Sequence, residues 1–470
     1  MAVDTDPDQA GRRVAAPAVL TDVLDRIDRD DVARAAMWLV WPFGIAVLFW
    51  VGRDQWFVRD DWAFLFSRRR FREVGGLDTM LLQPQDGHWM TWPILTFHAI
   101  RAVFGIGSYL PYLIVLWLTH LSIVLLAREW MRRLRVSAWT TTLMTAVLFV
   151  FGAGWENLLF AVQIVYNFSL LAFLAHTLLV DHDGPVDRRD WAGAGISLIG
   201  VSSSGFGPFF GFGVGLLLAL RRRWTAAAIA VVPQALAWSW WWLTWGADPA
   251  GEPGNAGVRF VVSFVQFGVW STFGSLVGTG LLAWSAFLLC VAMIVWPATD
   301  AARRAPMIAF LATALVMFAG IGLRREVFGS TAAGWPRYQY MAAMIVAPVL
   351  AVGLDQARRF ASWARWIPRV LLVIAVARNT GWMVDGGNYW SELAEGDRRV
   401  FSLVAGSDAR STVPPDGYMS DVSPDVQIRN LPELVDADAI TPIDPASPDD
   451  QAALDRAIQR ARETGLLPSP

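Results

Sequence analysis

Long apolar runs, separated by short polar segments, recur along most of this chain between residues 35 and 385. A helix needs roughly 20 apolar residues to cross about 30 Å of hydrocarbon, so runs of this kind predict membrane-spanning helices. The pattern predicts an all-α polytopic fold with about eleven spans. The predicted spans are residues 35–52, 109–127, 138–154, 157–180, 191–204, 207–220, 225–245, 278–297, 305–323, 338–354 and 369–385.

Arginine placement predicts the orientation, because short cytoplasmic loops are enriched in positive charge. Fifteen arginines lie in one set of short loops, at 128–135, 188–189, 221–223, 303–304 and 358–369. Only four arginines lie in the opposite short loops, so the first set is expected to be cytoplasmic. Those four are Arg259, Arg324, Arg325 and Arg337.

This orientation places the N-terminal segment 1–34 in the cytoplasm and the first loop, 53–108, outside a plasma membrane. The tail, 386–470, is then extracytoplasmic. The apolar segment 258–275 is expected to dip in or lie along the outer interface without crossing, since a further span would reverse every later arginine-rich loop. The region 35–385 is thus expected to form one transmembrane domain.

Composition agrees with a membrane protein. Hydrophobic residues make up 55% of the chain and charged residues only 17%, against about 25% charged in a typical soluble protein. The net charge of −2 argues against a nucleic-acid surface. A single cysteine, Cys290, excludes a disulfide within one chain and a paired-cysteine metal site.

The tail from Gly386 onward is acidic and rich in proline, with 15 Asp and Glu against 7 Arg. A solvated, loosely packed segment is expected there. One short helix is predicted over 448–464, with Ser447 as N-cap, Pro448 at the first helical position and Gly465 after its end.

The first outer loop carries the clearest candidate chemistry. Asp60 and Asp61 follow the first span closely, between Trp56 and Trp62, whose rings could anchor the loop at headgroup level. Adjacent carboxylates beside an interface are costly to bury unpaired. They indicate either a general base beside a lipid-borne substrate or solvated loop acids screened by neighbouring arginines. A divalent metal ion at Asp61 is a further alternative.

Basic residues of the same loop are candidates for a phosphate site. Arg68 and Arg69 open an arginine-rich stretch that breaks the positive-inside pattern, and they indicate either phosphate binding or contact with headgroups and loop acids. The stretch 88–105 mixes apolar and basic residues, beginning at His88. Arg101 would cost about 2.5 to 3.5 kcal/mol in mid-membrane, so this stretch is expected to lie along the interface.

Further candidates lie in later outer segments. Glu156 at the outer end of a span indicates catalysis or substrate contact, or simply a favourable electrostatic position. Arg324, Arg325 and Arg337 are candidates for holding a phosphate, since arginine matches phosphate oxygens bidentately. Pairing with Glu326 and lipid headgroups is the alternative. In the last predicted span, Arg378 and Asn379 require a buried partner that the sequence does not identify.

Taken with these motifs, the chain resembles the C-type glycosyltransferase superfamily. The resemblance rests on the acidic pair after the first span, a juxtamembrane helix ending in Phe104-Gly105, and a second span beginning near Tyr109. It extends to the short motifs 154–157 and 334–340, which contain Glu156 and the Arg337-Tyr338 pair. The sequence departs from several relatives at the juxtamembrane helix, where His88 and a later Pro93 stand in place of Lys-Pro-Pro.

The resemblance implies an enzyme that takes a sugar from a polyprenyl phosphate on the outer face of the membrane. The acceptor would be an envelope glycan, lipid or protein. By the same resemblance, the first acid of the pair, Asp60, is the catalytic base, with Asp61 beside it and Glu156 as a further carboxylate. Two alternatives remain open from sequence: a transporter or flippase for an envelope lipid, and an inactive relative that scaffolds other envelope enzymes.

Overall fold

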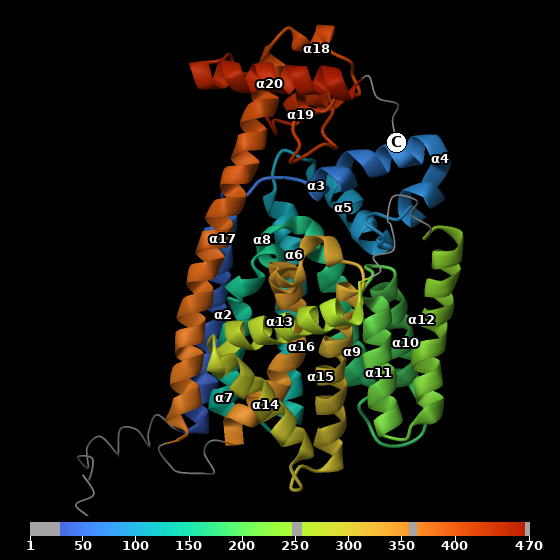
Figure 1. Ribbon diagram of the computed structural model, residues 1–470, viewed down its shortest axis with the longest axis vertical. Helices are drawn as coiled ribbons and strands as arrows, with labels where there is room; N and C mark the ends of the chain where they lie inside the picture. Colours follow the sequence, from blue (N-terminus) through green and yellow to red (C-terminus); the bar gives the residue numbers. More distant parts are fainter. Residues whose placement is uncertain (1–28, 247–255, 357–363, 466–470) are drawn as a thin grey trace, which may run out of the picture.

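The computed structural model describes residues 29–246, 256–356 and 364–465, and this part of the chain is helical with no β-strand. Long apolar helices pack side by side in a bundle, with a smaller subdomain at one end (Figure 1). The chain is therefore a polytopic all-α membrane protein, as the apolar pattern predicts. Residues 1–28 of the predicted cytoplasmic segment lie outside the described residues.

Eight helices in the described residues are long and apolar enough to cross a membrane. Seven of them coincide with predicted spans, and the eighth covers the ambiguous segment 258–275. The other four predicted spans fall on shorter helices of the described chain. The eight are α2 (Asp30–Gly52), α6 (Leu110–Arg133), Ala161–Val180 containing α9 (Ile164–Val180), α12 (Trp224–Thr244), α13 (Val258–Val277), α15 (Ala301–Gly322), α16 (Pro336–Asp355) and α17 (Trp366–Gly406). The shorter ones are α7 (Ala138–Phe149), α10 (Arg188–Val201), α11 (Gly207–Leu220) and α14 (Leu281–Val295).

Helix α13 lies crosswise to its neighbours rather than along the bundle (Figure 1). Because α13 is also long and apolar enough to cross, the expectation that this segment does not cross stays a prediction. Its last turn is held by the side chains that sequence left without a partner: Arg378 donates to the carbonyls of Gly274 and Ser275 at 2.8 and 2.9 Å, and Asn379 donates to Ser275 at 3.0 Å. The C-terminal carbonyls of α13 thus accept from Arg378 Nη2 and from the Asn379 amide.

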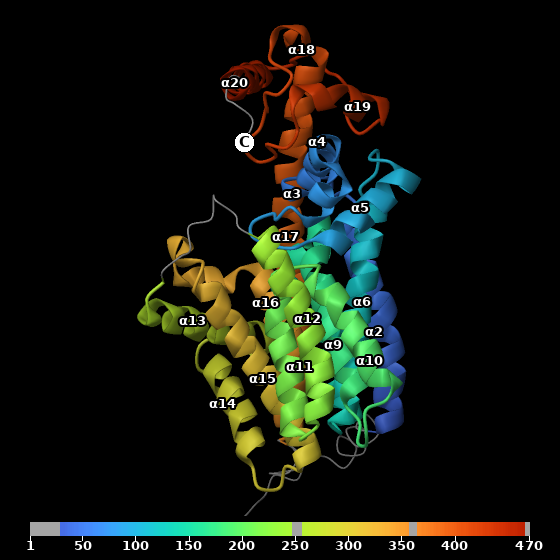
Figure 2. The same ribbon diagram turned by 90° about the vertical axis from the view of Figure 1, so that its right-hand side faces the viewer.

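The first loop forms three helical pieces at one end of the bundle: α3 (Asp60–Trp62), α4 (Arg68–Leu82) and α5 (Thr91–Phe104) (Figure 2). Helix α5 corresponds to the predicted interfacial helix. Its Arg101 donates to the Leu65 carbonyl and pairs with Glu433, so its charge is satisfied by protein groups.

The predicted boundary at Gly386 is wrong. Helix α17 continues through it to Gly406, and Gly386 and Gly387 are buried against neighbouring helices. The change in composition marks the point where α17 rises out of the bundle, since helical periodicity persists while the surroundings become polar (Figure 1).

Residues 407–465 form a compact C-terminal subdomain rather than a loose tail. It contains α18 (Ala409–Thr412), α19 (Leu431–Asp436) and α20 (Pro448–Thr464). Val426, Leu431 and Leu434 are fully buried in it. The prediction for 448–464 is confirmed, because the Ser447 hydroxyl accepts from the Asp450 amide as an N-cap and the helix ends before Gly465. The subdomain lies directly over the first loop in both views.

Candidate functional site

Asp60 is presented by a strained turn. The Asp61 amide donates to the Val58 carbonyl, closing a turn in which Arg59 has φ 53° and ψ −126°. These angles belong to a type II′ position that glycine usually occupies, and a non-glycine residue there costs about 1–3 kcal/mol. Strain of this kind persists only where surrounding structure enforces it.

The enforcing contacts come from α17 and the C-terminal subdomain. The Arg59 amide donates to Ser423 Oγ at 2.8 Å, and Ser423 in turn donates to Asp397 of α17 at 2.5 Å. The Arg59 guanidinium lies 5.4 Å from the ring centroid of Trp390, also on α17. The conformation before Asp60 is therefore fixed by residues more than 300 positions away in sequence.

Asp61 has a different role from its neighbour. It is fully buried and accepts from the amides of Val58 and Val162 at 3.3 and 3.0 Å and from the Tyr109 hydroxyl at 2.8 Å. Burial raises the pKa of Asp61 to about 8, although these three hydrogen bonds lower it. Asp61 ties the loop after α2 to the segment before α9, and its three hydrogen bonds are those of a structural residue.

Asp60 is only half-buried and faces other charges. Desolvation raises the pKa of Asp60 to about 6, with the negative charges of Asp86 and Asp425 acting in the same direction. Arg337 and Arg59 oppose this shift. A carboxylate with a pKa near neutral accepts a proton more readily than an ordinary aspartate does.

Glu156 and Arg337 form a partly buried ion pair in the same region. Arg337 Nε lies 3.3 Å from Glu156 Oε2, and the two side chains are 27% and 14% exposed. In the described structure neither of these two atoms has a hydrogen-bond partner of good geometry. Desolvation raises the pKa of Glu156, opposed by Arg337 and then Arg59. The pair thus retains donor and acceptor capacity that a ligand could use.

His88 lies near three arginines of this region. The Gly205 amide donates to His88 Nδ1 at 3.0 Å, and the ring stacks on Phe206. A side chain on Gly205 would collide with the imidazole, which explains the glycine. Desolvation lowers the pKa of His88 to about 3, and nearby arginine charges act in the same direction. The neutral ring therefore carries its proton on Nε2 and can donate it to an anion. The arginines are Arg324, Arg325 and Arg337.

The arginines at the end of α15 rest on aromatic faces. Arg324 lies 5.5 Å from the Trp242 ring centroid and Arg325 lies 5.5 Å from that of Phe328. Arg325 also hydrogen-bonds Tyr338, which is buried and stacked on Trp335. The predicted residues Asp60, Glu156, His88 and the three arginines are thus within electrostatic range of a common region, which we call the outer site.

Two further predicted phosphate ligands make contacts within the fold. Arg68 is fully buried and donates to the carbonyls of Met80 and Gln83 at 3.2 and 2.7 Å. Arg69 pairs with Glu433 of α19 at 2.7 Å. Arg68 thus contributes to the fold of α4 and Arg69 attaches the C-terminal subdomain, while Arg68 Nε has no hydrogen-bond partner among the described residues. Arg68 also lies within electrostatic range of Asp86 and Asp425. That these arginines hold a donor phosphate stays a prediction.

Trp56 and Trp62 are buried in the core rather than exposed at headgroup level.

Sequence reasoning also missed two acidic residues of the outer site. Asp86 stands in an Asp-Gly turn, a signal for local structure but not for its closeness to Asp60. Asp425 accepts from Ser67 and reaches the site only because the subdomain folds back onto the first loop.

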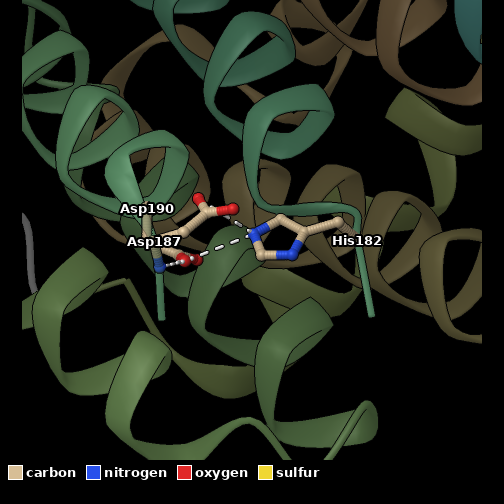
Figure 3. A group of neighbouring side chains, drawn as sticks. All are labelled: His182, Asp187 and Asp190. Atoms are coloured by element: carbon tan, nitrogen blue, oxygen red, sulfur yellow. Dashed lines mark hydrogen bonds and ion pairs between the residues drawn. The ribbon is translucent and has the colours of Figure 1, made fainter. Parts of the chain in front are cut away.

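A second cluster of acid and base, shown in Figure 3, lies in the connection between α9 and α10 and at the start of α10. His182 Nε2 lies 3.2 Å from Asp190 and 3.7 Å from Asp187. Within the described chain this is the group of three histidine or acidic donors close enough to hold a metal ion. However, Arg223 occupies the position a cation would take, donating to both oxygens of Asp190 at 3.0 Å and contacting His182.

We call these four residues the inner network. The Asp187 amide also donates to Asp190 at 2.9 Å, as part of the capping box of α10. The network is closed by protein groups and serves to cap a helix. Among the described residues, the outer site holds no group of three histidine, cysteine or carboxylate donors at chelating distance from one another.

No family model matches the chain, and searches among curated proteins and solved structures find no match either.

Proposed function

We propose that this protein is a membrane glycosyltransferase of the C-type architecture, which moves a sugar from a polyprenyl phosphate to an acceptor on the outer face of the plasma membrane. The observation that carries the proposal is the outer site itself. A half-buried Asp60 with a pKa near 6 lies within electrostatic range of Arg337. The site is built on one end of a polytopic helical bundle.

Each group has a role in the proposed reaction. Asp60 takes the proton of the acceptor hydroxyl while that oxygen attacks the anomeric carbon of the sugar. The bond between the anomeric carbon and the phosphate oxygen breaks, and the phosphate leaves with both electrons. Arg337, assisted by Arg324 or Arg325, stabilises the negative charge that develops on the phosphate. The new glycosidic bond and a protonated Asp60 complete the step.

Neighbouring residues support these roles. Glu156 orients Arg337 through their ion pair. His88 offers a neutral donor at Nε2, which suits a phosphate oxygen. Asp61 fixes the loop through Val162 and Tyr109. The proposed orientation, with eleven spans and the C-terminal subdomain outside, follows the arginine bias of the loops and places this site where lipid-linked sugars on the outer face would reach it.

Feeding radiolabelled polyprenyl-phosphate sugars to purified protein in vesicles, together with membrane acceptors, tests the proposal. Glycosyltransfer moves the label into a product that no longer extracts as the donor lipid. A flippase would instead change which face of the vesicle exposes the donor, with the donor chemically intact. That second result would contradict the proposed function.

A further inference from the structure

A cavity of about 450 Å³ is lined in part by Trp155, the residue directly before Glu156. It opens to the surface and is lined by the crosswise helix α13, the middle of α17, the loop before α8 (Glu156–Leu159) and the segment around the start of α16. Its volume falls in the range of about 300 to 1,000 Å³ typical of small-molecule sites. Small residues open the space: Gly152, Gly274, Gly334 and Gly386 all line it.

Aromatic side chains form much of the wall. Trp155, Trp270, Trp382 and Tyr389 come from three different segments of the chain. Trp155 is fixed against Gly386, where any side chain would collide with its ring. Flat rings held by separate elements provide apolar faces for a ring-shaped ligand with C–H groups above and below its plane.

The polar side chains of the wall include an unpaired acceptor and a carboxylate, beside the hydroxyl groups of Ser271, Ser275 and Thr279. Gln339 is 2% exposed, and its Nε2 donates to the Ala333 carbonyl at 2.7 Å. Its Oε1 has no partner in the described structure, a state that favours any ligand able to donate a hydrogen bond. Asp385 adds an exposed carboxylate. No arginine or histidine is among the described residues that line the cavity.

This chemistry restricts the ligand. A phosphate would meet a carboxylate and no cation among the lining groups, and an alkyl chain would leave the Gln339 oxygen unpaired. A neutral ring with several hydroxyl groups can stack on the tryptophans and donate to Gln339 and Asp385 at the same time.

Packed aromatic rings lie between the cavity and the turn that presents Asp60. Trp155 lies 5.4 Å from Trp390, centroid to centroid, and Trp390 carries the guanidinium of Arg59, the residue before Asp60. Trp155 also directly precedes Glu156. We infer that this cavity is a glycan-binding subsite for the acceptor, distinct from the arginine-lined position of the donor phosphate. The role of this glycan as the acceptor rests on the proposed function, whereas the binding of a neutral glycan rests on the residues of the cavity alone.

Saturation-transfer NMR on the full chain in lipid nanodiscs tests the inference, with a panel of methyl hexopyranosides and methyl pentofuranosides as probes. At least one glycoside should bind the wild type. Gln339→Leu should weaken it roughly tenfold or more, because the unpaired acceptor is gone. Ser271→Phe should abolish binding by filling the cavity, whereas Ser263→Phe, on the same helix but outside the cavity, should not.

Thermal midpoints of the variants check that loss of binding is not loss of fold. Absence of binding by every glycoside to the wild type would overturn the inference, as would unchanged affinity in folded Gln339→Leu. Displacement of a co-purifying lipid by Ser271→Phe, with glycoside affinity unchanged, would identify a lipid site instead.

The Asp60→Asn protein separates this inference from the proposed function. Glycoside binding should persist in it, since Asp60 does not line the cavity. The wild type could bind glycosides in a Gln339-dependent way and yet transfer no sugar. That result would support the glycan-binding site and contradict the proposed glycosyltransferase function.

Discussion

The outer site and the inner network use the same kinds of side chain but differ in how completely they are satisfied. In the inner network, Asp190 is 1% exposed, accepts from Arg223 and the Asp187 amide, and lies 3.2 Å from His182 Nε2. At the outer site, Arg337 Nε and Glu156 Oε2 lack hydrogen-bond partners, and Asp60 lies in a strained, half-buried turn. Closed clusters stabilise a fold, whereas open and strained ones are typical of functional sites.

The inner network would therefore be the wrong choice on residue type alone. Its histidine and two aspartates lie at metal-ligand distances, yet Arg223 neutralises and covers them. The two regions contain similar residue types, but they differ in whether their polar atoms have hydrogen-bond partners. That difference distinguishes them better than composition does. The predictions below test this difference, starting from the largest expected effect.

Substitution of Asp60 should lower the transfer rate, whereas substitution of Asp190 should lower the stability of the fold. Asp60→Asn keeps the shape but removes the basic oxygen, and general-base catalysis typically contributes about 10² to 10⁴-fold. The variant should lose at least roughly a hundredfold in transfer rate with an unchanged thermal midpoint. Asp190→Asn should show the reverse, a lower midpoint with normal turnover per folded molecule, because it weakens a buried pair.

Asp54→Asn is the matched control for Asp60→Asn, since Asp54 is an exposed acid of the same loop paired only with Arg53. Wild-type turnover in Asp60→Asn, with activity abolished in Glu156→Gln, would move the base to Glu156.

Removing the cation of the outer site should have the next largest effect. Charge-assisted hydrogen bonds are worth about 1.5 to 3 kcal/mol, so Arg337→Gln should lower donor use by roughly ten- to hundredfold. Titrating the donor in a transfer assay measures this. Arg69→Gln is the comparison, because its partner is Glu433 in the subdomain; an equal loss of donor use in that variant would contradict the assignment of Arg337.

The strained turn predicts a smaller effect. Ser423→Ala removes one neutral hydrogen bond to the Arg59 amide, worth about 0.5–1.5 kcal/mol, and should lower kcat by roughly three- to tenfold with little change in KM. Glycine tolerates positive φ, so Arg59→Gly in the same background should restore part of kcat. No recovery, with both proteins folded, would show that the turn geometry does not limit the reaction.

The smallest effect concerns pH. If Asp60 must be ionised, the rate should fall as the pH drops through about 6. Asp86→Asn removes a negative charge that raises the pKa of Asp60, so the acid limb should move to lower pH by less than about one unit. Residual activity of Arg337→Gln should show the opposite shift. Equal profiles in all three proteins would exclude Asp60 as the titrating group.

Local sequence signals were sufficient for several features. Ser447, Pro448 and Gly465 marked the limits of α20 correctly because capping depends only on neighbouring residues. Hydrophobic length located the apolar helices for the same reason. The boundary at Gly386 failed because composition reports the surroundings of a helix, not its continuity.

By itself, the sequence determined that this chain is a polytopic helical membrane protein with acids and arginines gathered in particular loops. It also drew attention to Asp60, Glu156, His88 and Arg337. Only the tertiary structure showed that Asp61 is buried and hydrogen-bonded while Asp60 is half-buried, gave Arg68 and Arg69 partners within the fold, and brought Asp425 to the first loop. These outcomes depend on burial and on contacts between residues hundreds of positions apart, which no local pattern encodes.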